Sequence, residues 1–295
     1  MKQAAPLVNL VVSTGEPAGI GPEVSLAAAL DFLREQNDVA ITLLADDQLL
    51  NLPKNLDTRL VGRLQIESIK LAAPVISGVL NPQNAQYVIA LLDQAINGCQ
   101  QGRFDAMVTA PLQKSIINDA GTPFTGHTEH LAQRCNISHV VMMLCAPLPA
   151  GFLGLKSPRD LRMALVTTHV PLKDVPKALS YDLILKTIQI VYRDLQKKFG
   201  IANPVIRMAG LNPHAGEAGY LGREEIEVIA PAIKVAQNLG IAISGPYPGD
   251  TMFDASALEK VDAFIAMYHD QGLAPFKFVS FGVGVNVTLG LPVIR

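Results

Sequence analysis

Short apolar runs alternate along this chain with longer amphipathic segments, in which apolar residues recur every three or four positions. The runs have the length of strands and the amphipathic segments the length of helices, an alternation typical of α/β proteins with largely parallel sheets. We expect strands over residues 7–14, 40–45, 106–109, 140–145, 163–168, 205–209 and 263–268, and helices after residue 23 and over 84–99, 175–199 and 224–239.

Length and composition limit the class of protein. A chain of 295 residues is long for one hydrophobic core and predicts two lobes. The apolar runs are too short to cross a bilayer, so we expect no membrane-spanning segment. A net charge of −2, with both signs interspersed, gives no basic surface for a nucleic-acid backbone.

The N-terminus and the cysteines indicate the compartment. The first residues run directly into a strand-like segment, without the apolar core and cleavage site of a secretory signal. Cys99, Cys135 and Cys145 are odd in number and lack metal-type spacing, so we interpret them as reduced packing residues. Together these features predict a cytoplasmic protein.

Three of the six histidines, His169, His214 and His269, follow apolar, strand-like runs. In an open α/β sheet the carboxyl ends of strands open onto the ligand crevice, so residues placed there converge on one site. Three converging imidazoles with an open coordination position would suit zinc or a similar divalent ion. The alternative is three unrelated polar residues, but the recurrence of the same context favours a metal site.

Two glycine-rich or basic turns are candidates for anion binding. The turn at residues 15–21 has the spacing G-x-x-x-G-x-G, which matches neither a dinucleotide fingerprint nor a P-loop. A tight packing turn and a ligand loop are about equally plausible there. Lys114 opens a predicted helix, where a cation is unfavourable, and this mildly suggests an anionic ligand.

A loop at residues 124–129 carries His127 and Thr128 into a predicted helix. These side chains could hold a phosphate or carboxylate together with backbone amides. Alternatively, Thr125 or Thr128 simply caps the helix. We assign His130 and His139 to the surface and leave both out of the site.

Further polar residues gather in the C-terminal third of the sequence. Asp250 lies in a turn whose chemistry alone can explain an aspartate. Asp270 follows His269 and could support it as a ligand. Lys277, Asn286 and Arg295 are groups that can grip an anionic substrate, and we therefore include them in the candidate site.

Six segments in chain order carry a family resemblance: Gly15–Glu23 (GEPAGIGPE), Gly126–Glu129 (GHTE), Thr167–Pro171 (TTHVP), Gly210–Glu217 (GLNPHAGE), Met267–Gly272 (MYHDQG) and Gly284–Pro292 (GVNVTLGLP). Together they resemble the motif set of the 4-hydroxythreonine-4-phosphate dehydrogenase family of vitamin B6 (pyridoxal phosphate) biosynthesis. The resemblance extends from about residue 9 to the last residue.

The resemblance implies a particular architecture and site. The fold would be two α/β/α lobes with a central cleft, like isocitrate and isopropylmalate dehydrogenases, with the active site at the interface of a homodimer. The metal ligands would be His169, His214 and His269, with His269 facing the site of the partner subunit. The residues that bind the phosphorylated substrate would be His127, Thr128, Lys277, Asn286 and Arg295.

The resemblance also implies the reaction. The substrate 4-phosphohydroxy-L-threonine would be oxidised with NAD or NADP in the presence of a divalent metal (zinc, magnesium or cobalt), and the product would lose carbon dioxide to give 3-amino-2-oxopropyl phosphate. The metal would lower the pKa of the substrate hydroxyl. Either Lys277 or Asp250 would accept the proton. The resemblance does not assign the residues that bind the nucleotide.

Two departures from the family pattern qualify the comparison. Residues 146–160 form a longer link than the family pattern leads us to expect, which we interpret as a surface insertion. Family members also continue beyond the position of Arg295. We therefore expect a first lobe of residues 1–125 plus 280–295 that lacks its C-terminal part, and a second lobe of residues 126–279 with the histidines.

Two other functions remain open from the sequence. Close relatives oxidise four-carbon sugar-acid phosphates such as erythronate or threonate phosphate, which lack the amino group. A shortened chain could instead be a catalytically silent homologue that still binds metal or phosphate.

Overall fold

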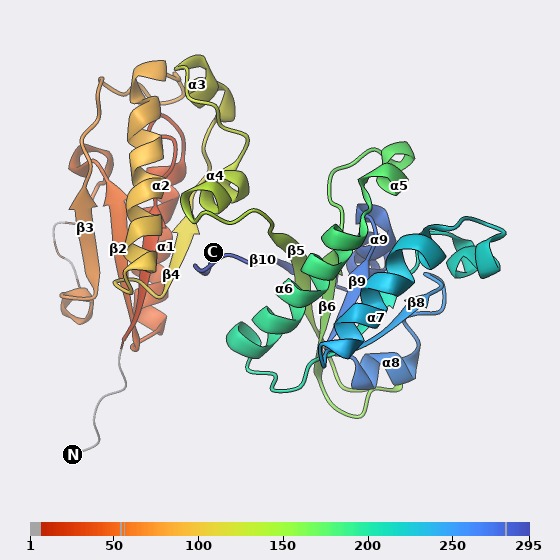
Figure 1. Cartoon of the computed structure of the whole chain (residues 1–295). Helices are drawn as coiled ribbons and strands as arrows, with labels where there is room; N and C mark the ends of the chain where they lie inside the picture. The colour runs from red at the N-terminus through yellow and green to blue at the C-terminus, as the bar shows by residue number, and fades with distance from the viewer. Residues whose placement is uncertain (1–6, 54, 56, 281) are drawn as a thin grey trace. The chain divides into compact units, whose positions relative to one another are not determined.

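A computed structural model describes residues 7–53, 55, 57–280 and 282–295 and divides the chain into two compact units (Figure 1). Unit 1 comprises Met1–Ser138 together with Leu291–Arg295, and unit 2 comprises His139–Gly290. Each unit is built around its own sheet with helices packed on it. The α/β class that the alternating pattern predicts is therefore confirmed.

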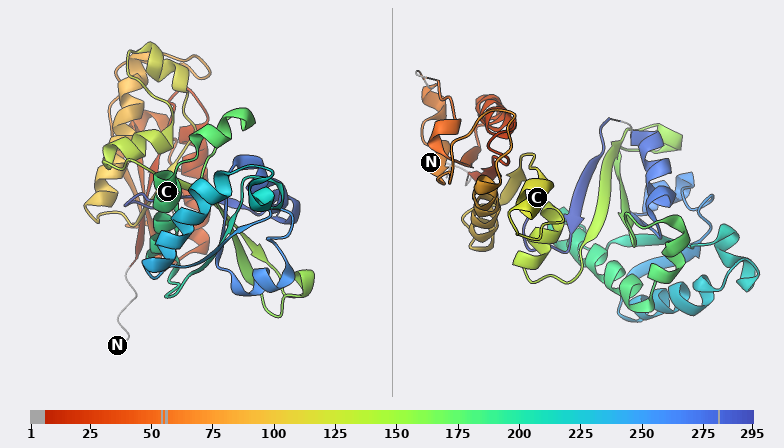
Figure 2. Two further views of the ribbon diagram at one scale, coloured as in Figure 1. Left: turned by 45° about the vertical axis from the view of Figure 1, so that its right-hand side comes forward. Right: turned by 90° about the horizontal axis from the view of Figure 1, so that it is seen from above.

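The unit boundaries lie elsewhere than at the positions that the sequence suggests, 125/126 and 279/280. The helix α4 (His127–Arg134) belongs to unit 1, where it contacts α2 (Ala85–Gln100). The strand β10 (Val285–Leu289) belongs to unit 2, because it pairs antiparallel with β5 (Val141–Leu148) at the edge of the sheet (Figure 2). His127 and Thr128 thus lie in unit 1 and Asn286 in unit 2.

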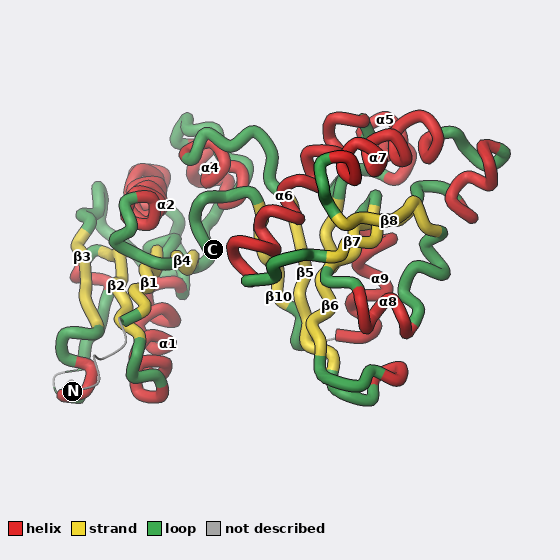
Figure 3. Tube along the Cα trace, turned by 60° about the horizontal axis from the view of Figure 1, so that its bottom comes forward, coloured by secondary structure: helices red, strands yellow, loops and turns green. Residues whose placement is uncertain are grey.

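The sheet of unit 1 has the order β3-β2-β1-β4, and all of its strand pairs are parallel. Its two long helices, α1 and α2, cover opposite faces of the sheet (Figure 3). The elements besides α2 and α4 are β1 (Val8–Ser13), α1 (Gly21–Glu35), β2 (Val39–Ala45), β3 (Leu64–Ser68), β4 (Ala106–Thr109) and α3 (Lys114–Asp119), with short 3₁₀ turns η1 (Asp47–Leu49), η2 (Thr58–Leu60) and η3 (Pro82–Asn84).

Unit 2 contains a mixed sheet of order β10-β5-β6-β9-β7-β8. The strands β6, β9, β7 and β8 are parallel neighbours, whereas β5 runs antiparallel to β6. The remaining strands are β6 (Arg159–Leu165), β7 (Val205–Ala209), β8 (Ala242–Tyr247) and β9 (Ala263–Ala266).

The helices of unit 2 bury both faces of this sheet (Figure 3). One apolar core lies between the sheet and α6 with α7, and a second lies between the sheet and α8 with α9. The helical elements are α5 (Val175–Ala178), α6 (Tyr181–Phe199), the π-helical turn η7 (Glu225–Ile229), α7 (Ala230–Asn238), α8 (Ala255–Lys260) and α9 (His269–Ser280), with short turns η4 (Phe152–Gly154), η5 (Leu172–Asp174) and η6 (Pro213–Gly219).

The predicted helix over residues 175–199 is two helices. Ser180 caps α6 by accepting a hydrogen bond from the Leu183 amide at 3.2 Å, and its extended backbone breaks the helical path after α5. The predicted end is confirmed, because Gly200 adopts φ +68° as the left-handed cap.

The segment 146–160, predicted to be a surface insertion, is a small extension of the sheet. The strands β5 and β6 reach into it from its two ends and pair as far as Leu148 with Arg159. Residues 149–158, which include the short turn η4, form the connection between the strands. Leu148, Leu155 and Leu161 are buried in the core with α8 and α9, so the extension is anchored by apolar packing.

Helix length and composition also bear on the membrane prediction. Within the part of the chain that the structure describes, no helix is both long and apolar enough to cross a membrane.

Candidate active site

The three candidate metal histidines follow three neighbouring strands of unit 2. His169 comes after β6, His269 after β9 and His214 after β7, and these strands lie side by side in the order β6-β9-β7. The three strands are parallel, so their carboxyl ends lie at one edge of the sheet. The prediction that each histidine follows a strand is confirmed, and the structure adds that the three strands are neighbours.

Two of these histidines are in contact. The ring centroids of His169 and His269 are 5.4 Å apart with an interplanar angle of 42°. Nδ1 of His269 lies 2.7 Å from Oδ1 of Asp270, a hydrogen bond that fixes the orientation of the ring. Because Nδ1 is engaged with the carboxylate, Nε2 is the nitrogen of His269 that is left for a ligand.

His214 lies on a loop of unusual backbone conformation. Its φ is +51°, and the residues that follow it in η6, from Ala215 to Ala218, also have positive φ. Such left-handed conformations are unfavourable for residues other than glycine. The side chain of His214 is 68% exposed, and its Nδ1 is 4.0 Å from Oε2 of Glu217. This loop therefore holds His214 outward in a strained turn.

A buried carboxylate that the sequence analysis did not identify holds the start of this loop. Oε1 of Glu225 accepts hydrogen bonds from the amides of Leu211 and Asn212, each at 2.7 Å, and Oε2 accepts one from the Asn212 side chain at 3.0 Å. Glu225 is only 3% exposed. Gly216 packs directly against it, since a Cβ there would lie 2.6 Å from Oε2.

The donor set suits a divalent metal, although one chain does not assemble all three ligands. Imidazole nitrogens with a supporting carboxylate are typical ligands of zinc and similar ions. No group of three His, Cys, Asp or Glu side chains that could hold a metal ion lies within residues 7–53, 55, 57–280 and 282–295. Two observations fit a metal site at this edge of the sheet: the rings of His169 and His269 are in contact, and Asp270 binds Nδ1 of His269.

An open hollow of about 620 Å³ adjoins His214 in unit 2. Its lining includes Asp250, Tyr268 and Gln271. Of the two candidate bases, Asp250 thus shares a hollow with one candidate metal ligand, whereas Lys277 lies exposed on α9. Asn286 lies exposed on β10, opposite Leu144 of β5.

The candidate substrate residues of unit 1 gather around the start of α4. His127 is its first residue and Thr128 its second. Nζ of Lys114 lies 3.4 Å from the position that a Cβ on Gly126 would take, directly before α4. Nε of Arg295 donates a hydrogen bond to the Thr109 hydroxyl at the end of β4, at 3.0 Å.

The electrostatics of this cluster suit an anion. Burial, together with the nearby charges of Arg295 and Lys114, lowers the pKa of His127 to about 4. Its Nε2 is buried and has no hydrogen-bond partner among the residues that the structure describes. A bound phosphate or carboxylate would offset the two cations and offer the imidazole a partner, and helix amides at the start of α4 favour the same charge.

The interpretation of the threonines as caps is wrong. Gly126 is the residue before α4, and no side chain caps this helix. The surface assignment of His130 and His139 is also wrong, because both are half-buried and hydrogen-bonded. Nε2 of His130 lies 2.8 Å from Oδ1 of Asp93, and Nε2 of His139 lies 3.1 Å from the Thr187 hydroxyl.

Packing explains the glycine-rich turn between β1 and α1. A Cβ on Gly15 would lie 2.2 Å from the Pro111 carbonyl oxygen, and one on Gly21 would lie 2.1 Å from the Thr14 carbonyl oxygen. The amide of Ala18 already donates to the buried Glu16 carboxylate at 3.2 Å. This geometry favours the packing turn over the ligand loop, and it identifies no nucleotide site there.

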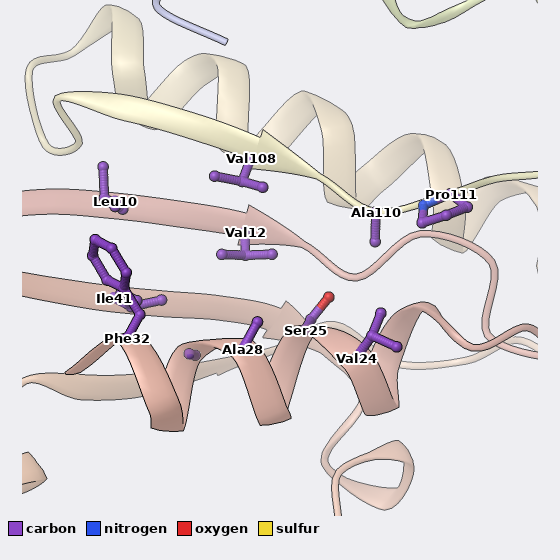
Figure 4. Close-up of a pocket in the computed structure, with 11 residues that line it drawn as sticks. Leu10, Val12, Val24, Ser25, Ala28, Phe32, Ile41, Val108, Ala110 and Pro111 are labelled. Atoms are coloured by element: carbon purple, nitrogen blue, oxygen red, sulfur yellow. The ribbon is translucent and has the colours of Figure 1, made fainter. Parts of the chain in front are cut away.

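Unit 1 also contains an apolar pocket of about 510 Å³ beside α1 (Figure 4). Val12, Val108 and Val24 point into it from β1, β4 and α1. Its lining carries no titratable side chain, and Ser25 is its only hydroxyl residue among the described lining. The pocket therefore lacks the groups that acid–base or metal chemistry requires.

Comparison with known proteins identifies the family. Residues 19–295 match the family described as "Pyridoxal phosphate biosynthetic protein PdxA". The chain is 50% identical to the 4-hydroxythreonine-4-phosphate dehydrogenase of Burkholderia vietnamiensis, over 99% of this chain and 88% of that protein. It is 49% identical to the 4-hydroxythreonine-4-phosphate dehydrogenase of Ralstonia nicotianae, over 98% of this chain and 88% of that protein.

A solved structure agrees with the sequence relatives. The crystal structure of 4-hydroxythreonine-4-phosphate dehydrogenase from Klebsiella pneumoniae matches with a TM-score of 0.81 at 29% identity, over 99% of this chain and 90% of that one. The matched region contains the last five motif segments whole and residues 19–23 of the first. The chain belongs to the family of the pyridoxal phosphate biosynthetic protein PdxA.

Proposed function

We propose that this protein is a 4-hydroxythreonine-4-phosphate dehydrogenase, an oxidoreductase of pyridoxal phosphate biosynthesis. It oxidises 4-phosphohydroxy-L-threonine to 2-amino-3-oxo-4-phosphooxybutanoate, which loses carbon dioxide to give 3-amino-2-oxopropyl phosphate. The observation that carries the proposal is 50% identity over 99% of the chain to a protein of that name. The strand-end histidines and the cationic cluster at α4 support it, because oxidation of this substrate would require a metal beside its hydroxyl and a binding site for its phosphate and carboxylate.

We propose His169, His214 and His269 as the ligands of a divalent metal. When bound, such a metal lowers the pKa of the substrate hydroxyl and stabilises negative charge on oxygen. Asp270 supports this role by orienting His269 through the 2.7 Å hydrogen bond at Nδ1. Zinc, magnesium and cobalt are all compatible with the proposal.

The anionic groups of the substrate are bound by His127, Thr128, Arg295, Lys277 and Asn286. Around α4, His127 is uncharged at neutral pH because its pKa is about 4, so the positive charge there comes from Arg295 and Lys114. A neutral imidazole donates or accepts a single hydrogen bond, which orients a phosphate or carboxylate oxygen without adding charge. Arg295 can bind two oxygens of the same group.

Oxidation of the hydroxyl carbon removes a hydride and a proton. We propose that the proton goes to the carboxylate of Asp250, because it lines the same hollow as His214, with Lys277 as the alternative. The hydride acceptor is a nicotinamide nucleotide, NAD or NADP, which the dehydrogenase chemistry requires. The ketone next to the carboxylate-bearing carbon then accepts the electron pair that carbon dioxide leaves behind.

We further propose that the enzyme acts as a homodimer in the cytoplasm and that His269 contributes to the site of the partner subunit. The support is that one chain, over its described residues, holds His169 and His269 in contact but gathers no group of three metal-binding side chains. In a dimer, the second copy would supply the third metal ligand, His269, to each site. Sedimentation with and without metal tests this assembly.

The test is turnover of 4-phosphohydroxy-L-threonine by the purified full chain, followed by the absorbance of the reduced nucleotide. We expect activity that disappears in chelator and returns with a divalent metal. His214→Ala should remove both bound metal and activity, whereas Glu227→Ala, on an exposed helical turn, should change neither. Activity that persists in chelator would refute the metal requirement.

A parallel assay separates this function from that of sugar-acid phosphate dehydrogenases. Erythronate and threonate phosphates lack the amino group but retain the hydroxyl and the phosphate. Faster turnover of either compound than of the amino acid would replace the proposed substrate and leave the reaction class unchanged. Metal binding without turnover of any of them would indicate a silent homologue.

A further inference from the structure

The three candidate metal histidines lie beyond the ordered pairing of their strands. The last paired residues are Leu165 of β6, Ala266 of β9 and Ala209 of β7, and each histidine comes three to five residues later. Past these points a few backbone hydrogen bonds continue, as from the Val166 amide to the Ala266 carbonyl oxygen at 2.9 Å, but none of the three strands extends as far as its histidine. Other contacts must therefore determine where the imidazoles stand.

Thr167 adds a side-chain bond to the backbone bonds that join the ends of β6 and β9. The hydroxyl of Thr167 donates to the carbonyl oxygen of Met267 at 2.7 Å, and its amide donates to the same oxygen at 3.2 Å. Thr167 is 6% exposed and Met267 is fully buried. These two residues stand two positions before His169 and His269, so this contact spaces the two histidine segments.

The ends of β9 and β7 are joined by one glutamine. Oε1 of Gln271 accepts a hydrogen bond from the amide of Met267 at 2.7 Å, and Nε2 donates to the carbonyl oxygen of Gly210 at 2.7 Å. Gln271 lies in the first turn of α9, two residues after His269, and Gly210 lies four residues before His214. A single side chain therefore connects the two segments.

We propose that Gln271, assisted by Thr167, is a positioning residue that holds the ends of β6 and β7 at a fixed spacing across the end of β9. It thereby sets the separation of His169 and His214, the two ligands that one chain would give to the same metal, and it holds the segment from which His269 projects toward the partner's site. This inference rests on the proposed metal-dependent function. Met267 is the centre of the network, because its amide binds Gln271 and its carbonyl binds Thr167. Both bonds of Gln271 go to backbone atoms, so it acts on the ligands through their chain segments, although its side chain also lines the hollow beside His214.

The chemistry of the two bonds explains why the residue is glutamine. The position requires an acceptor toward Met267 and a donor toward Gly210, and a carboxamide supplies both. Glutamate has the same shape but no donor, so Gln271→Glu would place a carboxylate oxygen against the Gly210 carbonyl oxygen at 2.7 Å. Repulsion at that contact separates the β7 and β9 ends while leaving the volume unchanged.

The test is a Co²⁺ titration of the full-length protein, read by its visible absorption spectrum and by metal content after gel filtration. Supporting residues around a metal typically change its affinity 10- to 100-fold, and we expect a loss of about 10-fold or more in Gln271→Glu with an altered cobalt spectrum. Thr167→Val should also weaken Co²⁺ binding and alter the cobalt spectrum, whereas Thr167→Ser, which keeps the hydroxyl, should show the wild-type spectrum.

The matched control is Gln237→Leu. Gln237 also donates from Nε2 to a backbone carbonyl in unit 2, that of Ile243 at 2.9 Å, but it joins α7 to β8 and touches no histidine segment. We expect a lower unfolding midpoint in this variant with an unchanged cobalt spectrum and affinity. A purely structural role of Gln271 predicts that Gln271→Glu behaves in the same way.

The outcomes separate the two proposals. If the wild type binds Co²⁺ through the histidines and Gln271→Glu and Thr167→Val bind it equally well with the same spectrum, the positioning role is overturned. If the wild type binds no Co²⁺, or His214→Ala binds it undiminished, the proposed metal site itself fails and the positioning role fails with it. If Gln271→Glu does not fold, the Thr167 pair decides the question.

Discussion

The carboxylate of Glu225 offers a direct test of how the strained His214 loop is held. Glu225→Ala removes an acceptor of three hydrogen bonds, two of them from the backbone amides of Leu211 and Asn212. A buried amide left without a partner costs about 1–3 kcal/mol. Both residues are half-buried, so water reaches the amides in part and the lower end of that range applies, about 2–3 kcal/mol for the pair.

The loop beyond Asn212 is costly in itself. His214, Ala215, Glu217 and Ala218 have φ between +43° and +54°. A left-handed conformation costs roughly 1–2 kcal/mol per residue other than glycine, or about 4–8 kcal/mol for the four. This strain is at least as large as the stabilisation lost with Glu225. Other contacts therefore share in holding the turn, so we expect the strained turn of Glu225→Ala to persist but to open more often, with the unfolding free energy lower by about 2 kcal/mol, the cost of the two amides.

Two measurements check this prediction. Urea unfolding should show the loss of about 2 kcal/mol, and hydrogen exchange should show faster exchange confined to residues around 211–219. Glu227→Ala is the control, since its partner Arg223 is 63% exposed and surface pairs of this kind contribute only about 0.3–0.5 kcal/mol. Unchanged exchange in the loop of Glu225→Ala would refute the idea that the carboxylate holds the strained turn.

Three further predictions follow from contacts described above. Gly21→Ala should lower the unfolding free energy by more than about 2 kcal/mol because its Cβ would meet a backbone oxygen at 2.1 Å, whereas Gly19→Ala, with its nearest contact at 3.4 Å, should be tolerated in the same thermal or urea assay. The pKa of His127 in the folded protein is about 4, below the ordinary value of 6.5 that it has in the unfolded chain. The stability is therefore full above pH 6.5 and falls as the pH decreases toward 4, and His127→Asn should flatten that part of the curve of unfolding midpoint against pH. Asp270→Asn should weaken metal binding about 10-fold or more because His269 loses its orienting carboxylate, and an unchanged affinity in a cobalt titration would argue against that role.

The strand-end histidines could be located from the sequence because two local signals coincide. A buried parallel strand is a continuous apolar run, and a polar residue just after it lies at the ligand-binding edge of the sheet. His169, His214 and His269 satisfy both conditions, and the structure places their strands next to one another. Local sequence does not contain the order of strands, so this adjacency could be expected only by analogy.

The elements that sequence reasoning missed have weaker local signals. The edge strand β10 is exposed at Val285 and Asn286 and becomes buried only toward Leu289, so it shows no period-two alternation, and its pairing with β5 is what makes it a strand. The break before α6 was overlooked because apolar periodicity continues through Leu179, although Ser180 is a typical cap.

Contacts between residues that are far apart in the sequence cannot be predicted from local sequence. Gln271 binds Gly210 across 61 positions, and nothing in either local sequence indicates the other. The role of Glu225 is likewise visible only once the loop before His214 is folded against it. Supporting residues of this kind depend on tertiary contacts, whereas ligands at strand ends follow from local pattern.

The discontinuous make-up of unit 1 has a consequence for the order in which the protein can mature. The amide of Met107 in β4 donates to the carbonyl oxygen of Ile294, and Arg295 binds Thr109 of the same strand. A ribosome delivers residues 291–295 only after the whole of unit 2 has been synthesised. The nascent chain can complete the histidine edge of unit 2 earlier, while the cationic cluster of unit 1 forms only once Arg295 has been added.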